Sequence, residues 1–256
     1  MKGEETTDEL RRYGLRLIQP RDGYRYSLDP LLLCAFAGAR ARGGSMIDLG
    51  SGCGIIPLLM AGHYGASSAT GVERQPELVT LAERNAALNA VGAVVRTLQD
   101  DVLNLRRHFP VSSFDMVLSN PPFRHPGTGK ISPKVGRDAA RHETTAGLKD
   151  FLAAAKYLVK PDGSIFFVYH PSRLQEFMAV SAGLKLAIAR LRMVHGTIGA
   201  AARIFLVELK KGRKCDLAIE PPLVIYRDNG GYGDEAEAVL GESSGKQAWQ
   251  QLPDGL

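Results

Sequence analysis

The stretch that decides the fold is SMIDLGSGCGIIPLLMA, residues 45–61. Its first five residues form the short apolar run of a buried strand, and a second apolar run from Ile55 has Pro57 in a first helical turn. Between them, Gly50, Gly52 and Gly54 allow a tight turn and leave no Cβ between the backbone and a ligand. The stretch therefore predicts a strand, a glycine-rich turn and a helix, a unit that binds ligands at the carboxyl end of a parallel sheet.

The same alternation continues towards the C-terminus. Apolar runs predict further strands, and amphipathic stretches predict helices at 76–89, 148–158 and from Ser172 to about Ala182; the strands are expected at 68–72, 94–98, 114–119, 164–169, 185–194 and 204–209. Strands that alternate with helices favour right-handed crossovers. The sequence therefore predicts an α/β fold with a mostly parallel sheet covered by helices on both faces.

Three regions divide the chain. Residues 1–44 are expected to form a small appendage that closes the site, with strand-like pieces at 15–18 and 24–26 and a helix over 30–39 started by Asp29. Residues 45–226 form the main domain, in which 217–226 add an edge strand. Residues 227–256 are rich in Gly, Ser, Glu and Gln, which predicts a flexible acidic tail.

Composition excludes several classes of protein. The 256 residues are 45% hydrophobic and carry a net charge of +5, and no apolar run is long enough to span a membrane. The three cysteines lack CxxC spacing and the six histidines lack ligand spacing, so we expect no disulfide scaffold and no metal site. The chain is predicted to be a cytoplasmic enzyme with no membrane association and no obligate protein partner.

Acidic residues beside the glycine loop indicate a nucleoside cofactor. Glu73 ends the next predicted strand and would accept both ribose hydroxyls, with Arg74 beside it in the same site. The loop lacks both the GxGxxG spacing of dinucleotide sites and a P-loop lysine. Asp48 and Asp101 place negative charge at the pocket, which suits a sulfonium with an α-ammonium group. Asp101 is assigned to the adenine amino group, and its neighbour Asp100 competes for that role.

The segment Ser119-Asn120-Pro121-Pro122-Phe123 follows the predicted strand 114–119 and so lies at the same edge of the sheet. The side-chain carbonyl of Asn120 and the backbone carbonyl of Pro121 would accept hydrogen bonds from a planar amine and aim its nitrogen at a methyl group. Asn120 is also expected among the cofactor-binding residues. Phe123 would stack on the ring that carries this amine, a contact worth ~1–3 kcal/mol for a base. The alternative is a proline-rich turn with a core phenylalanine.

With these motifs the chain resembles class I S-adenosylmethionine-dependent methyltransferases that carry N-P-P-[FY], and within them the bacterial tRNA (adenine-N6) methyltransferases acting on the anticodon loop of a valine tRNA. The resemblance runs from about Leu15 to Tyr226 and includes the segments 23–33, 141–145 and 221–226. It implies a Rossmann-like seven-stranded sheet with an antiparallel last strand. It also implies that S-adenosylmethionine is the cofactor, that RNA is the partner, and that Tyr26, Ser27 and Asp29 lie near the methionine end of the cofactor.

Two basic segments flank the motifs, at 121–150 and 183–214. A basic footprint fits a polyanion, although the same residues also suit an ordinary solvated surface. The predicted contacts to substrate RNA are Lys130, Lys134, Arg137, Arg141, His142, Lys210, Lys211 and Arg213.

Other activities stay open on the residues alone. The amino group could belong to a guanine of ribosomal RNA or to a protein glutamine, because N-P-P-[FY] specifies the chemistry of the amine and not its carrier. A non-catalytic RNA-binding relative would be expected to have degraded motifs, which are intact here. An O-methyltransferase gains nothing from Asn-Pro-Pro-Phe, and an NAD oxidoreductase is disfavoured by the loop spacing.

Overall fold

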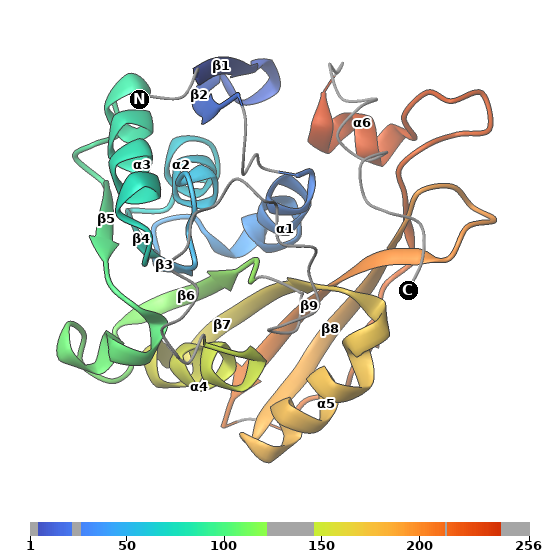
Figure 1. The fold of residues 1–256 in the computed structure, drawn as a ribbon. Coiled ribbons are helices and arrows are strands. Elements are labelled where there is room, and N and C mark those ends of the chain that lie inside the picture. Colours follow the sequence, from blue (N-terminus) through green and yellow to red (C-terminus); the bar gives the residue numbers. More distant parts are fainter. Residues whose placement is uncertain (1–4, 22–26, 122–145, 213, 242–256) are drawn as a thin grey trace, which may run out of the picture.

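A single large sheet organises the molecule (Figure 1). The computed structural model describes residues 5–21, 27–121, 146–212 and 214–241. The strands of this sheet are β3 (Ser45–Leu49), β4 (Ser68–Glu73), β5 (Val95–Gln99), β6 (Phe114–Ser119), β7 (Val159–Tyr169), β8 (Leu186–His195), β9 (Ala202–Lys211), β10 (Ala218–Ile219) and β11 (Leu223–Val224). Their order is β10-β8-β9-β7-β6-β3-β4-β5, and β11 also pairs with β8.

The long strands confirm the predicted topology. Seven of them, β3 to β9, form a sheet in which β9 is antiparallel to its neighbours β7 and β8, while the pairs among β3 to β7 are parallel. The edge strand expected over 217–226 is present as two short pieces, β10 and β11, which pair with β8 in parallel. Strand β7 begins at Val159, earlier than predicted, and its register with β6 shifts between Phe114 and Met116.

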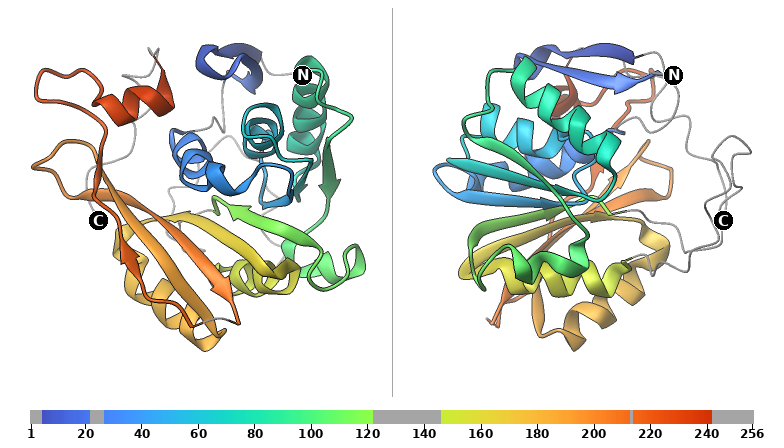
Figure 2. Two further views of the ribbon diagram at one scale, coloured as in Figure 1. Left: turned by 180° about the vertical axis from the view of Figure 1, so that it is seen from behind. Right: turned by 60° about the vertical axis from the view of Figure 1, so that its left-hand side comes forward.

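Helices cover both faces of the sheet (Figures 1 and 2). The helices are α1 (Asp29–Ala37), α2 (Ile55–Gly62), α3 (Pro76–Leu88), α4 (Leu148–Leu158), α5 (Leu174–Gly183) and α6 (Asp234–Leu240). The first three pack on one face, and α4 and α5 pack on the other, each layer with its own buried apolar cluster. Residues 165–169 of β7 are all buried because both sides of the strand are covered.

The start of α5 differs from the prediction, whereas that of α1 agrees with it. Helix α5 begins at Leu174 rather than at Ser172, after a 3-10 turn in which the His170 side chain accepts a hydrogen bond from the backbone N–H of Ser172. Asp29 starts α1, with Pro30 next to it in the first turn. The predicted strand at 24–26 lies outside the described residues.

The N-terminal residues form a separate hairpin of β1 (Glu5–Leu10) and β2 (Leu15–Pro20), which pair antiparallel. Strand β2 was predicted, whereas β1 was not, because its alternation is of charged and polar residues with little apolar content. The hairpin packs through β2 against α2 and α3 (Figure 1). Leu17 of β2 is fully buried in the core.

The segment after Tyr226 differs from the flexible tail that composition predicts. Up to Gly241 it is folded: the rings of Tyr226 and Tyr232 stack with centroids 5.3 Å apart, and α6 follows. The Tyr13 hydroxyl of the N-terminal hairpin region donates to the Val239 carbonyl at 2.6 Å, and Arg192 of β8 pairs with Glu235 at 2.5 Å. Packing partners elsewhere in the chain therefore fold this segment.

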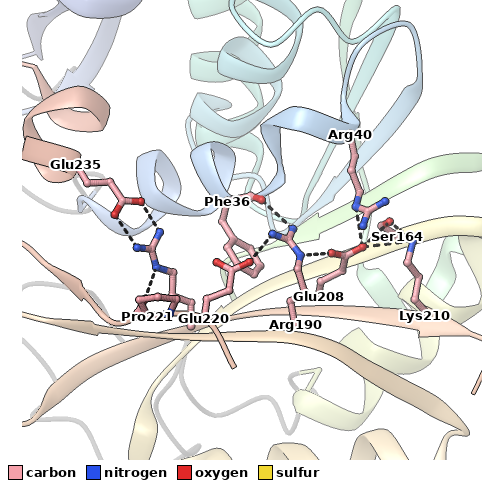
Figure 3. Close-up of polar contacts among 10 residues, drawn as sticks. Phe36, Arg40, Ser164, Arg190, Glu208, Lys210, Glu220, Pro221 and Glu235 are labelled. Atoms are coloured by element: carbon pink, nitrogen blue, oxygen red, sulfur yellow. Dashed lines mark hydrogen bonds and ion pairs between the residues drawn. The ribbon is translucent and has the colours of Figure 1, made fainter. Parts of the chain in front are cut away.

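A buried carboxylate ties α1 to the sheet (Figure 3). Glu208 of β9 is fully buried and pairs with Arg190 of β8 at 2.5 Å and with Arg40 after α1 at 2.9 Å. Arg190 also donates to the Phe36 carbonyl at 3.1 Å and lies over the Phe36 ring, 4.2 Å from its centroid. Although burial opposes ionisation of Glu208, the hydrogen bond from Arg190 and the nearby cations lower its pKa.

Candidate active site

The candidate site lies where the chain changes direction across the sheet. From β3 the chain passes outward to β4 and β5 and then crosses to β6 on the other side of β3. Open α/β sheets bind ligands at such a switch point, outside the carboxyl ends of the strands. Ser119 is the last residue of β6, and Leu49 is the last residue of β3. The Ser119 hydroxyl donates to the Leu49 carbonyl at 2.8 Å, and this bond is buried. The Asn-Pro segment and the glycine loop therefore begin side by side.

The glycine loop has the conformation that its residues predict. Gly50, Gly52 and Gly54 have φ values of 77°, 55° and 84°, the left-handed region that favours glycine. The N–H groups of Gly50 and Ser51 donate to the Val72 carbonyl at 2.9 and 2.8 Å. A Cβ on Gly54 would lie 2.9 Å from the Cβ of Ala82 in α3, so only glycine lets α3 pack this closely.

Glu73 lies against the glycine loop. It ends β4, is 7% exposed, and its two oxygens accept from the N–H groups of Gly52 and Gln75, both at 2.9 Å. These bonds fix the carboxylate and leave further lone pairs for a pair of hydroxyls. The neighbouring Arg74 is exposed at the same edge.

Two buried carboxyl groups are incompletely hydrogen-bonded among the described residues. Both side-chain oxygens of Asp48 and one of Asp29 accept no hydrogen bond from any described group. Burial raises the pKa of Asp48 to about 7 and that of Asp29 to about 6. Cys34 of α1 lies near enough to Asp48 that the carboxylate adds to the rise of its thiol pKa, which burial mainly causes. Burial of a carboxylate without a partner costs free energy, so these two aspartates suit a ligand that brings a positive charge.

The two aspartates after β5 have different environments. Asp100 accepts from the backbone N–H of Asp101 at 2.6 Å and from Asn104 at 2.8 Å, and it pairs with His108. Burial opposes ionisation of Asp100, but these hydrogen bonds lower its pKa. One oxygen of Asp101 accepts from the N–H of Leu103 at 2.9 Å, which caps the following 3-10 turn. Of the two side chains, Asp101 keeps more capacity for an adenine amino group.

The structure places some of the predicted site residues and not others. Asn120 and Pro121 follow β6 directly, and the Ser27 hydroxyl accepts from the N–H of Asp29 at 3.3 Å. The predicted site residues outside the described ranges are Tyr26, Phe123, Lys130, Lys134, Arg137, Arg141, His142 and Arg213.

Lys210 and Lys211 are not brought to this site. Because β9 is antiparallel to β7, its C-terminal end lies at the opposite edge of the sheet, beside Ser164 and away from Tyr169. The Lys210 ammonium contacts the Ser164 hydroxyl at 2.6 Å, and that of Lys211 contacts the Val159 carbonyl at 3.1 Å. A surface hollow of about 480 Å³ lined by Arg40, Asp115, Lys160 and Ser164 also lies at that far edge.

Sequence reasoning missed two residues that support the site. Ser119 was assigned only as the start of a motif, and Asn85 only as part of a helix, although its fully buried amide donates to the Cys53 carbonyl in the glycine loop at 3.0 Å. The sequence pattern that could have indicated a role for Asn85 is its spacing of four residues from a second asparagine, Asn89. In the described ranges, no three His, Cys, Asp or Glu side chains gather as metal ligands. None of the described helices is both long and apolar enough to cross a membrane.

Comparison with curated proteins finds relatives over most of the chain. The tRNA1(Val) (adenine(37)-N6)-methyltransferase of Porphyromonas gingivalis is 28% identical over 221 residues, covering 82% of this chain and 85% of the relative. The enzyme of the same name from Aeromonas hydrophila is 27% identical, covering 84% and 87%. An rRNA N(6)-adenosine-methyltransferase of Caenorhabditis elegans is 28% identical over 141 residues, covering 55% and 58%.

Solved structures share the fold. A protein described as a predicted O-methyltransferase from Agrobacterium tumefaciens superposes with a TM-score of 0.66 at 22% identity, covering 82% of this chain and 94% of that one. The tRNA m1G37 methyltransferase of M. jannaschii superposes with a TM-score of 0.59 at 15% identity, covering 84% and 56%. Both likenesses show the Rossmann-like fold of class I methyltransferases.

The family profile named methyltransferase small domain matches residues 30–195, which run from α1 to the end of β8 and include the whole glycine loop, Glu73 and the Asn-Pro segment. Class I methyltransferases use S-adenosylmethionine, and the unpartnered buried acids of this site fit its cationic methionine end. The chain belongs to the methyltransferase small domain family and is an S-adenosylmethionine-dependent methyltransferase.

Proposed function

We propose that this enzyme transfers a methyl group from S-adenosylmethionine to the exocyclic N6 amino group of an adenine in tRNA. The observation that carries the proposal is the position of Asn120 and Pro121 at the switch point, next to a glycine loop and to buried unpartnered acids. The names of the relatives from Porphyromonas gingivalis and Aeromonas hydrophila, which specify N6 of adenine 37 in a valine tRNA, support the choice of substrate.

Each end of the cofactor has residues suited to it. Asp48 and Asp29 would bind the methionine ammonium group, Glu73 would accept hydrogen bonds from the ribose hydroxyls, and Asp101 would accept one from the adenine amino group. Tyr26, Ser27 and Arg74 complete this set by resemblance. When bound, the cofactor supplies an activated methyl group on a sulfonium. Gly50 and Gly52 let the backbone approach it without a side chain between them.

The chain's own residues prepare the amine. The lone pair of an adenine amino group is delocalised into the ring, which makes the nitrogen a poor nucleophile. The Asn120 side-chain carbonyl and the Pro121 backbone carbonyl accept its two hydrogens and draw the nitrogen towards tetrahedral geometry, while Phe123 stacks on the base. These contacts would hold the nitrogen lone pair towards the methyl group that the bound cofactor would supply.

Positioning accounts for most of the expected acceleration. Two bound reactants in line convert a bimolecular step into a unimolecular one, and the two carbonyl dipoles stabilise positive charge as it develops on nitrogen. The proton becomes acidic only after alkylation and passes to solvent, so neither a strong base nor a metal is needed in this mechanism. The adenine must leave its stack, which costs less in an anticodon loop than in a duplex.

Other acceptors are second candidates. The relative from Caenorhabditis elegans, whose name specifies adenosine in ribosomal RNA, favours an adenine of that RNA as the alternative. Guanine in ribosomal RNA and glutamine in a release factor use the same amine chemistry. A cytosolic location fits an RNA substrate and the three free cysteines Cys34, Cys53 and Cys215.

One experiment separates these acceptors. The enzyme is incubated with labelled S-adenosylmethionine and, separately, with total tRNA, ribosomal RNA and release factor from a strain that lacks the gene. Label in N6-methyladenosine from tRNA is the expected result; label only in ribosomal RNA or in release factor would contradict the proposal. Addition of EDTA should leave the rate unchanged.

A variant checks the chemical role. We expect Asn120→Ala to lose at least a hundredfold in turnover while S-adenosylhomocysteine still binds, because the side chain orients the amine rather than holding the cofactor. Equal loss of binding and of turnover would mean that Asn120 is structural.

A further inference from the structure

Two asparagines take the place of a neighbouring strand beside β2: Asn85 of α3, and Asn89, which caps the C-terminal end of that helix. The Asn85 side-chain oxygen accepts from the N–H of Ile18 at 2.7 Å, and its nitrogen donates to the Ile18 carbonyl at 3.1 Å. One helical turn later, Asn89 makes the same pair of bonds to Arg16, at 2.8 and 2.7 Å. Residues four apart on a helix thus satisfy alternate residues on the open edge of a strand.

Asn85 makes one contact that Asn89 does not. Its side-chain nitrogen also donates to the Cys53 carbonyl at 3.0 Å, so one amide bridges the N-terminal hairpin and the glycine loop. Asn85 is 0% exposed. A buried amide that loses its hydrogen bonds is destabilising, so a shift of either partner carries a penalty for the other.

The same helix holds the glycine loop at a second point. Ala82, one turn before Asn85, lies against Gly54, where an added Cβ would be 2.9 Å from the alanine methyl group. On its other side the loop is tied to Glu73 through the N–H of Gly52 at 2.9 Å. The loop is therefore clamped between a cofactor-binding carboxylate and α3.

The path of the chain also connects the N-terminal hairpin to the proposed cofactor site. Strand β2 ends at Pro20, and the chain returns at Ser27 and Asp29, whose carboxyl group we assign to the cofactor. The hairpin is thus linked to the cofactor site twice, once through the chain to Asp29 and once through Asn85 to Cys53.

We infer that Asn85 is a positioning residue that couples docking of the β1–β2 hairpin to binding of the cofactor in the glycine loop. The inference rests on the proposed use of the site for S-adenosylmethionine. Such coupling is reciprocal: cofactor binding stabilises the docked hairpin by the same factor by which the docked hairpin strengthens cofactor binding.

Asn89 provides a matched control, because Asn85→Ala and Asn89→Ala each remove a pair of bonds to β2 but only the first removes the bond to the loop. We expect the Kd for S-adenosylhomocysteine, measured by calorimetry, to rise about tenfold in Asn85→Ala and less than about twofold in Asn89→Ala. In steady state, Asn85→Ala should raise KM for the cofactor and keep kcat at saturation. Equal changes of Kd in the two variants would overturn the inference.

Hydrogen exchange first tests the coupling in the wild-type protein, and that result does not depend on the folding of a variant. Saturation with S-adenosylhomocysteine should slow exchange of the Ile18 and Arg16 amide hydrogens at least severalfold, and Asn85→Ala should abolish this effect while Asn89→Ala preserves it for Ile18. Unchanged exchange at Ile18 would overturn the coupling. A wild-type protein that binds no S-adenosylhomocysteine would instead overturn the cofactor assignment itself.

Discussion

The hydroxyl of Ser119 bonds to the carbonyl of Leu49 at 2.8 Å, which joins the last residue of β6 to the last residue of β3. The residue after Ser119 is Asn120, and the residue after Leu49 is Gly50. Together with the parallel pairing of β3 and β6, this bond therefore fixes the spacing between the groups proposed to orient the amine and the loop proposed to hold the methyl donor.

Ser119→Ala should impair turnover more than folding. Loss of the buried bond costs about 1–3 kcal/mol of unfolding free energy, measurable by urea denaturation. We expect kcat to fall by at least tenfold, because small misplacement of reactants is costly in rate. Ser119→Thr, which keeps a hydroxyl, is the control. An unchanged kcat in Ser119→Ala would show that the spacing does not depend on this bond.

Cofactor affinity should depend on pH near neutrality. Burial raises the pKa of Asp48 to about 7 and of Asp29 to about 6 in the protein without cofactor. A cationic ammonium group binds the ionised carboxylates, so the Kd for S-adenosylhomocysteine should rise as pH falls below about 7, by up to tenfold per unit for each carboxyl group. Calorimetry between pH 8 and pH 5.5 measures this, and a flat profile would contradict the assignment of these acids.

Asp48→Asn should stabilise the cofactor-free protein while removing cofactor binding. The folded-state pKa of Asp48, about 7, lies above its unfolded value of 3.8, so the folded protein keeps a proton that the unfolded chain loses. Stability therefore falls as pH rises from about 4 to about 7. A neutral amide avoids this loss, and we expect a higher Tm than wild type at pH 8, by several degrees. A lower Tm without cofactor would refute this reading of Asp48.

Alanine substitutions of Asp101 and Asp100 should have different effects on cofactor preference and on Tm. Asp101→Ala should abolish the preference for S-adenosylhomocysteine over its inosine analogue. The reason is that the Asp101 carboxylate accepts a hydrogen bond from the adenine amino group, which inosine lacks. Asp100→Ala should keep that preference and lower Tm, since it removes bonds to Asn104 and His108. Competitive binding of the two nucleosides measures the preference of each variant, and thermal denaturation measures its Tm. Loss of the preference in Asp100→Ala alone would reverse the assignment.

Arg190→Met should destabilise the fold strongly. It leaves Glu208, fully buried, without its nearest cation and frees the Phe36 carbonyl (Figure 3). Removing one partner of a buried ion pair typically costs about 3–5 kcal/mol. Arg40→Met should cost less, because the Arg40 side chain is 48% exposed. Chemical denaturation of both variants checks the order, and equal midpoints would contradict it.

The sequence predicted the sheet and the site edge because strand and helix periodicities there are strong. Runs such as residues 45–49 and 114–119 are mostly apolar, and the glycines between strand and helix mark the turn. The locations of Glu73 and Asn120 follow from where two strands end, and Asp48 is the last residue but one of its strand.

Other features depend on contacts that periodicity does not encode. The role of Asn85 requires knowing that β2 lies beside α3. Lys210 and Lys211 were assigned to RNA from local charge, but the direction of β9 carries them to the far edge. The α6 helix is short and acidic, and its Ala236 is buried only through packing on the rest of the domain.

The contact between Tyr13 and Val239 shows that residues beyond the last strand belong to the folded unit. A chain shortened after its last strand at Val224 would leave the tyrosine hydroxyl without its acceptor and Arg192 without Glu235. Variants that are trimmed for crystallisation, or fused to another protein at the C-terminus, should therefore keep the sequence through Gly241.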